Sequence, residues 1–116
     1  MFSYASVLDA QSIRPEAKNE NLVLTAVQKY NGRDFSGAEA ILKQVVADDP
    51  QNDAAWYYLS LCAVSRQDLE TAEECLRAAS EIDPSNYWYR YRLAGLYAMT
   101  SRPELTVDMY EKLLED

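Results

Sequence analysis

The chain of 116 residues is long enough for one domain with a modest core, and its apolar content of 48% argues against disorder. Three glycines and four prolines argue against a turn-rich all-β fold. The net charge of −8 disfavours nucleic acid or an anionic membrane surface as a partner, because binding to either relies on lysine and arginine side chains.

Targeting signals and cysteine motifs are not evident in the sequence. It has no run of 18 apolar residues that would span a membrane, and its N-terminus lacks the basic and apolar regions of a signal peptide. Cys62 and Cys75 lack CxxC spacing, so we expect free thiols that pack as small apolar residues. These features predict a cytoplasmic protein without membrane insertion, unless the chain is a fragment of an exported protein.

The first segment, residues 1–18, is expected to contain a short helix over residues 1–13. This helix ends at Ile13-Arg14-Pro15, which has the same spacing as Ile82-Asp83-Pro84. Two interpretations therefore stay open at this point: residues 1–18 form a plain lead-in helix, or they form the second half of a preceding repeat.

The next segment, residues 19–52, is expected to form two helices joined by a turn. Ala38, Leu42 and Val45 lie on one face of the second helix. Gly32 is expected to adopt a positive φ after the first helix, and Asp34 or Ser36 is expected to cap the second.

Residues 53–86 repeat this pattern most clearly. Trp56, Leu59, Ser60 and Ala63 lie on one face of the predicted first helix. The second helix is expected to begin after an N-cap at Asp68, to carry Ala72, Leu76 and Ala79 on its apolar face, and to end before Pro84.

The last segment, residues 87–116, carries Leu93, Ala94 and Tyr97 at the corresponding positions of its first helix. Ser101 and Glu104 have the spacing of a capping box, which predicts the start of another helix. This unit ends about four residues short of a full period.

The order Trp-x2-Leu-Ser-x2-Ala, Ala-x3-Leu and Pro in residues 56–84 resembles the Trp-x2-Leu-Gly-x2-Tyr, Ala-x3-Phe and Pro pattern of the tetratricopeptide repeat family. Pro50 and Pro84 are also separated by the family's period of 34 residues. The resemblance implies an all-α solenoid of about seven helices, stacked as antiparallel pairs in a right-handed superhelix. It implies a single domain over residues 1–116, with repeats at 19–52, 53–86 and 87–116, the last one truncated.

Catalytic groups are scarce in the sequence. The chain has no histidine, which removes His-based acid–base catalysis and Ser–His or Cys–His nucleophiles. It has no glycine-rich loop for a phosphate, and its acidic doublets are adjacent residues that point apart on a helix. We therefore expect no enzymatic activity, no metal site and no cofactor.

The resemblance implies a concave groove lined by the first helix of each pair. The residues mapped to this groove by register are Val23, Val27, Tyr30, Tyr57, Leu61, Val64, Trp88, Tyr91 and Arg92. So apolar and aromatic a surface is typical of an interaction site, and tyrosine, tryptophan and arginine are common in binding hot spots. Gly95 is expected to leave a shallow notch among them. Trp88 and Tyr91 could equally pack against the preceding helix pair, whereas Tyr89 is expected to pack.

One specific function of the family is disfavoured by the residues. Tetratricopeptide domains of co-chaperones hold a C-terminal carboxylate with lysine, asparagine and arginine side chains. The corresponding positions in this sequence are Val23, Val27, Tyr58, Trp88 and Arg92. Only Arg92 fits, so we do not expect this chain to bind a chaperone tail in that way.

The sequence therefore predicts a protein-interaction module that binds a peptide or helix of a protein partner in the groove. The alternative is a structural segment of a longer solenoid, or a self-associating scaffold. The last helix favours this alternative, because it presents Val107, Tyr110 and Leu114 with no helix behind them, and terminal repeats need a polar outer face. A weaker alternative is a small secretion-type chaperone, which shares the three-repeat size and the acidic charge.

Overall fold

The computed structural model describes residues 15–100 and 103–115, with only the backbone of residues 15, 16, 103, 106, 109, 110, 112 and 115. Within this part of the chain there are six helices and no strand. They are α2 (Pro15–Asn31), α3 (Phe35–Asp48), α4 (Asp53–Ser65), α5 (Leu69–Ile82), α6 (Tyr87–Met99) and α7 (Pro103–Glu115). The number is smaller than the seven or so predicted, and the helix expected over residues 1–13 lies outside the described residues.

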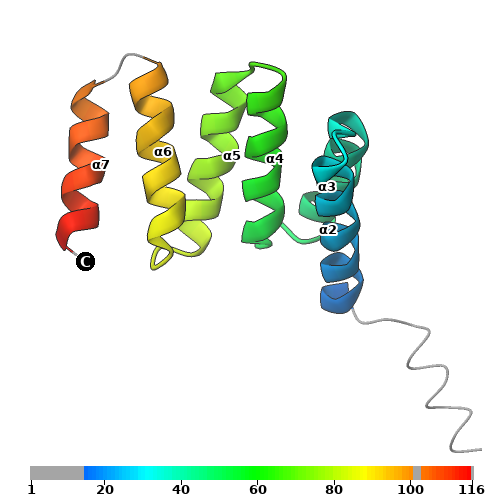
Figure 1. Ribbon diagram of the computed structural model, residues 1–116. Helices are drawn as coiled ribbons and strands as arrows, with labels where there is room; N and C mark the ends of the chain where they lie inside the picture. Colours follow the sequence, from blue (N-terminus) through cyan, green and yellow to red (C-terminus); the bar gives the residue numbers. More distant parts are fainter. Residues whose placement is uncertain (1–14, 101–102, 116) are drawn as a thin grey trace, which may run out of the picture.

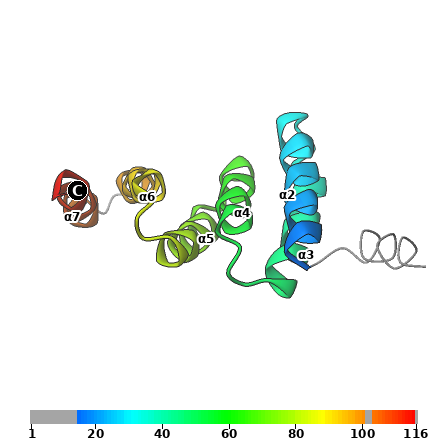
Figure 2. The same ribbon diagram turned by 90° about the horizontal axis from the view of Figure 1, so that it is seen from below.

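The helices form antiparallel pairs that follow one another along an elongated strip of 63 × 32 × 20 Å (Figure 1). Viewed from below, α2, α4 and α6 lie in one row, and α3 and α5 lie in the other (Figure 2). This arrangement is the predicted stack of helix pairs.

Two apolar cores hold the successive pairs together. The core between the first and second pairs consists of Val23, Ala26, Ala38, Leu42, Val45, Ala55, Leu59, Cys62 and Cys75. The core between the second and third pairs consists of Ala63, Ala72, Leu76, Ala79, Tyr89, Leu93, Leu96 and Tyr97. Each pair therefore buries its apolar faces against its immediate neighbours, as expected for a solenoid.

The buried positions of α4 and α6 recur exactly one period apart. Ala55, Leu59, Ser60, Cys62 and Ala63 of α4 correspond, 34 residues later, to Tyr89, Leu93, Ala94, Leu96 and Tyr97 of α6. The second helices behave in the same way, since Ala38, Leu42 and Val45 of α3 correspond to Ala72, Leu76 and Ala79 of α5. The predicted core positions of residues 53–86 are thus confirmed, apart from Trp56, which is half-buried.

Helix α2 departs from this pattern. It begins at Pro15, so residues 15–18, which we expected in the lead-in segment, form its first turn; proline is tolerated there because the first N–H groups of a helix have no intrahelical partner. Its buried residues are Asn19, Val23 and Ala26. The Asn19 amide donates a hydrogen bond of 3.0 Å to the Asp48 carboxylate and so joins the start of α2 to the end of α3.

The turns inside the first two pairs have the same design. Asp34 caps α3 and Asp68 caps α5, as predicted, through hydrogen bonds from the backbone N–H groups of Gly37 and Thr71. The positive φ expected at Gly32 was wrong. It occurs one residue later, at Arg33 (70°), because there it lets the N–H of Asp34 reach back to the Lys29 carbonyl at 2.8 Å.

Candidate functional site

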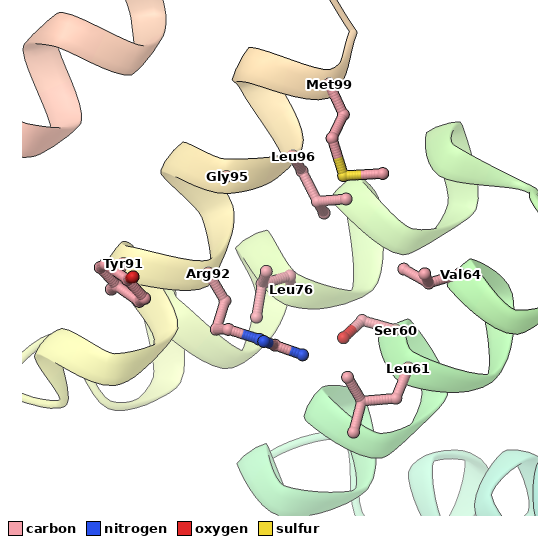
Figure 3. Close-up of a pocket in the computed structure, with 9 residues that line it drawn as sticks. All are labelled: Ser60, Leu61, Val64, Leu76, Tyr91, Arg92, Gly95, Leu96 and Met99. Atoms are coloured by element: carbon pink, nitrogen blue, oxygen red, sulfur yellow. The ribbon is translucent and has the colours of Figure 1, made fainter.

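A cleft of about 390 Å³ opens between α4 and α6 (Figure 3). It is lined by Ser60, Leu61, Val64, Leu76, Tyr91, Arg92, Gly95, Leu96 and Met99. Four of these residues, Leu61, Val64, Tyr91 and Arg92, belong to the groove predicted from the sequence. The structure therefore brings together residues of the predicted groove that come from α4 and α6.

Helical periodicity positions the two walls of the cleft. Leu61 and Val64 stand three residues apart on α4, and Arg92, Gly95 and Met99 follow one another at offsets of three and four on α6. These offsets place each set of side chains on one face of its helix. The two faces meet across the cleft, and α5 supplies Leu76 behind them (Figure 3).

Gly95 provides the open centre of the α6 wall. Apart from its two chain neighbours and the backbone of its own helix, a Cβ atom added at this position would have no heavy atom within 4 Å. The notch predicted at Gly95 is therefore present, and below it Leu76 and Leu96 contribute apolar surface that is almost completely buried. The cleft is thus apolar at its base and open above the glycine.

A chain of aromatic contacts leads from α4 to the cationic group at one end of the cleft. The indole N–H of Trp88 donates a hydrogen bond of 3.0 Å to the Tyr57 hydroxyl. The guanidinium carbon of Arg92 lies 5.5 Å from the Trp88 ring centroid, which is cation–π distance. Trp88 also stacks on Tyr91, with ring centroids 5.6 Å apart. These contacts hold Arg92 where it extends from α6 towards α4 (Figure 3).

The structure places Trp88 and Tyr91, which the sequence left open, and Tyr89, which was expected to pack, in different environments. Trp88 is 45% exposed and Tyr91 is 48% exposed, so both belong to the surface rather than the core. Tyr89 is buried, as expected, and its hydroxyl donates a hydrogen bond of 2.7 Å to the Asp53 carboxylate. Burial and, after it, this hydrogen bond raise the pKa of Tyr89 far above its ordinary value.

The predicted groove residues of the first unit are not part of the cleft. The prediction that Val23 lines the groove was wrong, because its side chain is buried in the core between the first two pairs. Val27 and Tyr30 are half-buried against that core, and the Tyr30 ring has edge contacts with Phe35 and Tyr58 at centroid distances of 5.1 and 6.3 Å. The register that placed Val23 in the groove assumed that α2 buries the same positions as α4, which it does not.

Four lining residues were absent from the predicted site: Ser60, Leu76, Leu96 and Met99. The pattern assigns Ser60 and Leu76 to the core, where they are indeed buried, but they also border the cleft because Gly95 has no side chain to cover them. Met99 was detectable, since it continues the stripe of Arg92 and Gly95 by one more turn.

Reactive groups are scarce among the described residues. Among residues 15–100 and 103–115, no three His, Cys, Asp or Glu side chains are grouped so that they would hold a metal ion. Cys62 and Cys75 are free and buried, and burial raises the pKa of each thiol to about 11. No helix in this part of the chain has the length and apolarity needed to cross a membrane.

The predicted self-association surface lies on α7. Val107 is 55% exposed and Leu114 is 87% exposed. They stand seven residues apart, which is two helical turns, so they share one face of the helix. The side chain of Tyr110 lies outside the described residues.

Comparisons with known proteins agree on the fold. A family model described as tetratricopeptide repeat matches residues 32–90, half of the chain. None of the curated proteins matches the sequence. Among solved structures, MamA (41-end) from Desulfovibrio magneticus RS-1 is 21% identical with a TM-score of 0.76, and the match covers 81% of this chain and 53% of MamA. The chain thus spans about half the length of that structure.

Two further similar structures contain a bound peptide. One is the Yersinia enterocolitica type III secretion chaperone SycD in complex with a peptide of the translocator YopD, with 12% identity and a TM-score of 0.73 over 78% of this chain and 69% of SycD. The other is the second TPR of Spaghetti (RPAP3) bound to the HSP90 peptide SRMEEVD, with 14% identity and a TM-score of 0.76 over 83% of this chain and 89% of that one. At these identities the likeness shows the fold alone.

Proposed function

Because the chain belongs to the tetratricopeptide repeat family, we propose that it is a protein-interaction module whose cleft between α4 and α6 binds a segment of a protein partner. The peptide complexes of SycD and of the second TPR of RPAP3 support this proposal by analogy of fold. The chain's own residues support it through the shape and the chemistry of the cleft.

The observation that carries the proposal is the open space above Gly95 in a cleft whose base is formed by apolar side chains. A cleft of about 390 Å³ falls in the size range of known ligand pockets. An apolar side chain of leucine size that entered it would leave water, which stabilises binding by about 1.5–3 kcal/mol. The exposed rings of Trp88 and Tyr91 extend this apolar surface beside the cleft.

The polar groups of the cleft suit recognition rather than catalysis. Arg92 is the one charged side chain among the residues that line it, and Ser60 already donates its hydroxyl hydrogen to the Tyr57 carbonyl at 2.5 Å. A fixed cation at one end of an apolar cleft orients a bound segment, but it supplies no nucleophile and no general base.

Filling the cleft tests the proposal. Peptides are first selected from a random dodecapeptide library with the wild-type chain, and their affinity is then measured by fluorescence polarisation. The change Gly95→Leu is expected to weaken binding at least ten-fold, because the new side chain occupies the notch. The fold is expected to be preserved, since the added atoms enter open space and glycine is a poor helix former.

The matched control is Ala98→Leu, which adds the same side chain at an exposed position of α6 outside the cleft. It is expected to leave the affinity unchanged. Equal affinities for the wild type and Gly95→Leu would contradict the proposal.

A second candidate function, self-association through α7, is favoured by the exposure of Val107 and Leu114. These apolar side chains occupy the positions that Glu73 and Ser80 hold one period earlier, on the helix that packs against α6. In this second proposal the surface formed by Val107, Tyr110 and Leu114 is covered by another copy of the chain.

Sedimentation velocity tests this second proposal: the wild type would dimerise, and Val107→Glu with Leu114→Glu would yield a monomer. A monomeric wild type at high concentration would contradict it.

A further inference from the structure

A second pocket lies between α2 and α4 and shares no lining residue with the cleft. Its volume is about 290 Å³, and it is lined by Glu20, Val23, Leu24, Asn52 and Ala54. Leu24 is 61% exposed, so its side chain is accessible to a partner beside the pocket. The pocket therefore offers a second apolar contact area on the same row of helices as the cleft.

Helix α4 connects the two pockets along one face. Ala54, Tyr57, Leu61 and Val64 follow one another at offsets of three, four and three, so their side chains form a single stripe. Ala54 borders the second pocket at the start of this stripe, and Leu61 and Val64 border the cleft at its end. A ligand that lies across α4 would reach both.

The separation of the pockets selects the conformation and spacing of such a ligand. From Ala54 to the middle of Leu61 and Val64 the stripe rises about 13 Å, and the step from one pocket across α4 to the other lengthens this path by a few ångström. An extended chain covers this distance in about five residues.

The charges at the two ends differ in sign. Glu20 borders the second pocket, and Arg92 borders the cleft. A segment with a basic residue beside its first apolar anchor and an acidic residue beside its second is complementary to both ends, and this fixes its direction. The same segment reversed would place like charges together at each pocket.

We propose that one extended segment of a partner protein occupies both pockets, with two apolar side chains about five residues apart, a basic residue at the Leu24 end and an acidic residue at the Arg92 end. This inference rests on the proposed function, to which it adds the second pocket, the spacing and the direction of the ligand.

The test uses the peptides selected with the wild-type chain. The selected sequences are expected to share two apolar residues four to six positions apart, with the stated charges. Removing two residues between the two apolar side chains of the peptide is expected to weaken binding about ten-fold. The change Leu24→Ser in the protein is expected to have an effect of the same size. In both cases one apolar side chain of the peptide loses part of its burial. The control is Tyr87→Ser, which removes a similarly exposed large side chain at the start of α6, outside both pockets, and is expected to have no effect.

Charge reversal tests the direction. Glu20→Lys is expected to weaken the binding of the selected peptide. It is expected to strengthen the binding of a peptide variant in which the basic residue is replaced by glutamate. If Glu20→Lys changes neither affinity, the direction assigned to the segment is wrong.

The outcomes separate the two proposals. If Gly95→Leu abolishes binding but Leu24→Ser leaves it unchanged, the ligand uses the cleft alone, and the two-pocket inference is overturned while the proposed function stands. If Gly95→Leu has no effect, or the library yields no ligand, both fail. If Tyr87→Ser weakens binding as much as Leu24→Ser, the ligand binds outside the two pockets, which also overturns the inference.

Discussion

Helix α2 and the later first-row helices α4 and α6 show what a repeat pattern does and does not determine. On α4 and α6, three positions face the preceding helix pair: Ala55, Leu59 and Cys62, and one period later Tyr89, Leu93 and Leu96. On α2 the same positions hold Asn21, Thr25 and Gln28, and all three are exposed. Interior helices bury two sides, whereas α2 presents a polar face on one of them.

This difference explains why α2 buries other residues than its register suggests. A polar face of this kind is what a terminal repeat needs in order to stay soluble. Thr25 and Lys29 are exposed on α2, which buries Val23 in the core between the first two pairs together with Ala26, the residue that keeps the register position of Ser60. Among the described residues, the face of α2 that holds Asn21, Thr25 and Gln28 is therefore polar and exposed, whereas the same face of α4 and α6 is buried.

The largest expected effect on stability comes from substitutions at equivalent positions of α6 and α2. Leu93→Ala removes a buried side chain from the core between the second and third pairs and is expected to lower the free energy of unfolding by about 2–5 kcal/mol. Thr25→Ala changes the equivalent position of α2 and is expected to change it by no more than about 0.5 kcal/mol. Urea denaturation followed by circular dichroism measures both.

The contrast between α2 and α6 would be contradicted if Thr25→Ala were as damaging as Leu93→Ala. Such a result would mean that the polar face of α2 is covered.

A smaller, stabilising effect is expected in the equivalent turns of the first two helix pairs. Arg33 and Gln67 both adopt a positive φ, at 70° and 63°, in equivalent turns. Glycine adopts this conformation without the steric cost of a Cβ atom, so Arg33→Gly and Gln67→Gly are each expected to raise the free energy of unfolding by about 0.5–1 kcal/mol. Thermal denaturation checks this, and a loss of stability in either variant would contradict the equivalence of the two turns.

A separate effect, confined to alkaline pH, concerns the core beside α2. Burial raises the pKa of Cys62 and Cys75 from the ordinary 9.0 to about 11. Above pH 9 the unfolded chain releases these protons while the folded chain retains them, so their contribution to stability is present below pH 9 and is lost as the pH rises towards 11. Cys62→Ala with Cys75→Ala is expected to flatten this alkaline decline in urea titrations, and an unchanged slope would contradict the burial of the thiols.

The sequence was sufficient for the stack because the alternation of small and large residues repeats with the chain's period. Leu59, Ala72 and Leu76 are placed where the pattern puts them, and the aspartate caps at Asp34 and Asp68 form through local geometry. The conformation of the turn was harder to predict, because the left-handed residue is chosen by the hydrogen bond that it permits and not by the nearest glycine.

The site could be predicted only where neighbouring helices follow the same pattern of buried and exposed positions. Leu61, Val64, Tyr91 and Arg92 follow from the register of α4 and α6, and Met99 would have followed from extending the stripe. Val23 was predicted to line the groove but is buried in the core, because the orientation of α2 depends on what lies on its outer side. That information resides in tertiary packing, which a period of 34 residues does not encode.

The most direct test of the cleft is a nuclear magnetic resonance titration of the ¹⁵N-labelled chain with a selected peptide. The account predicts that the largest shifts occur at the backbone amides of Leu61, Gly95 and Met99, which line the two walls of the cleft. Shifts confined to α7, around Val107 and Leu114, would contradict it and would place the interaction surface at the end of the stack instead.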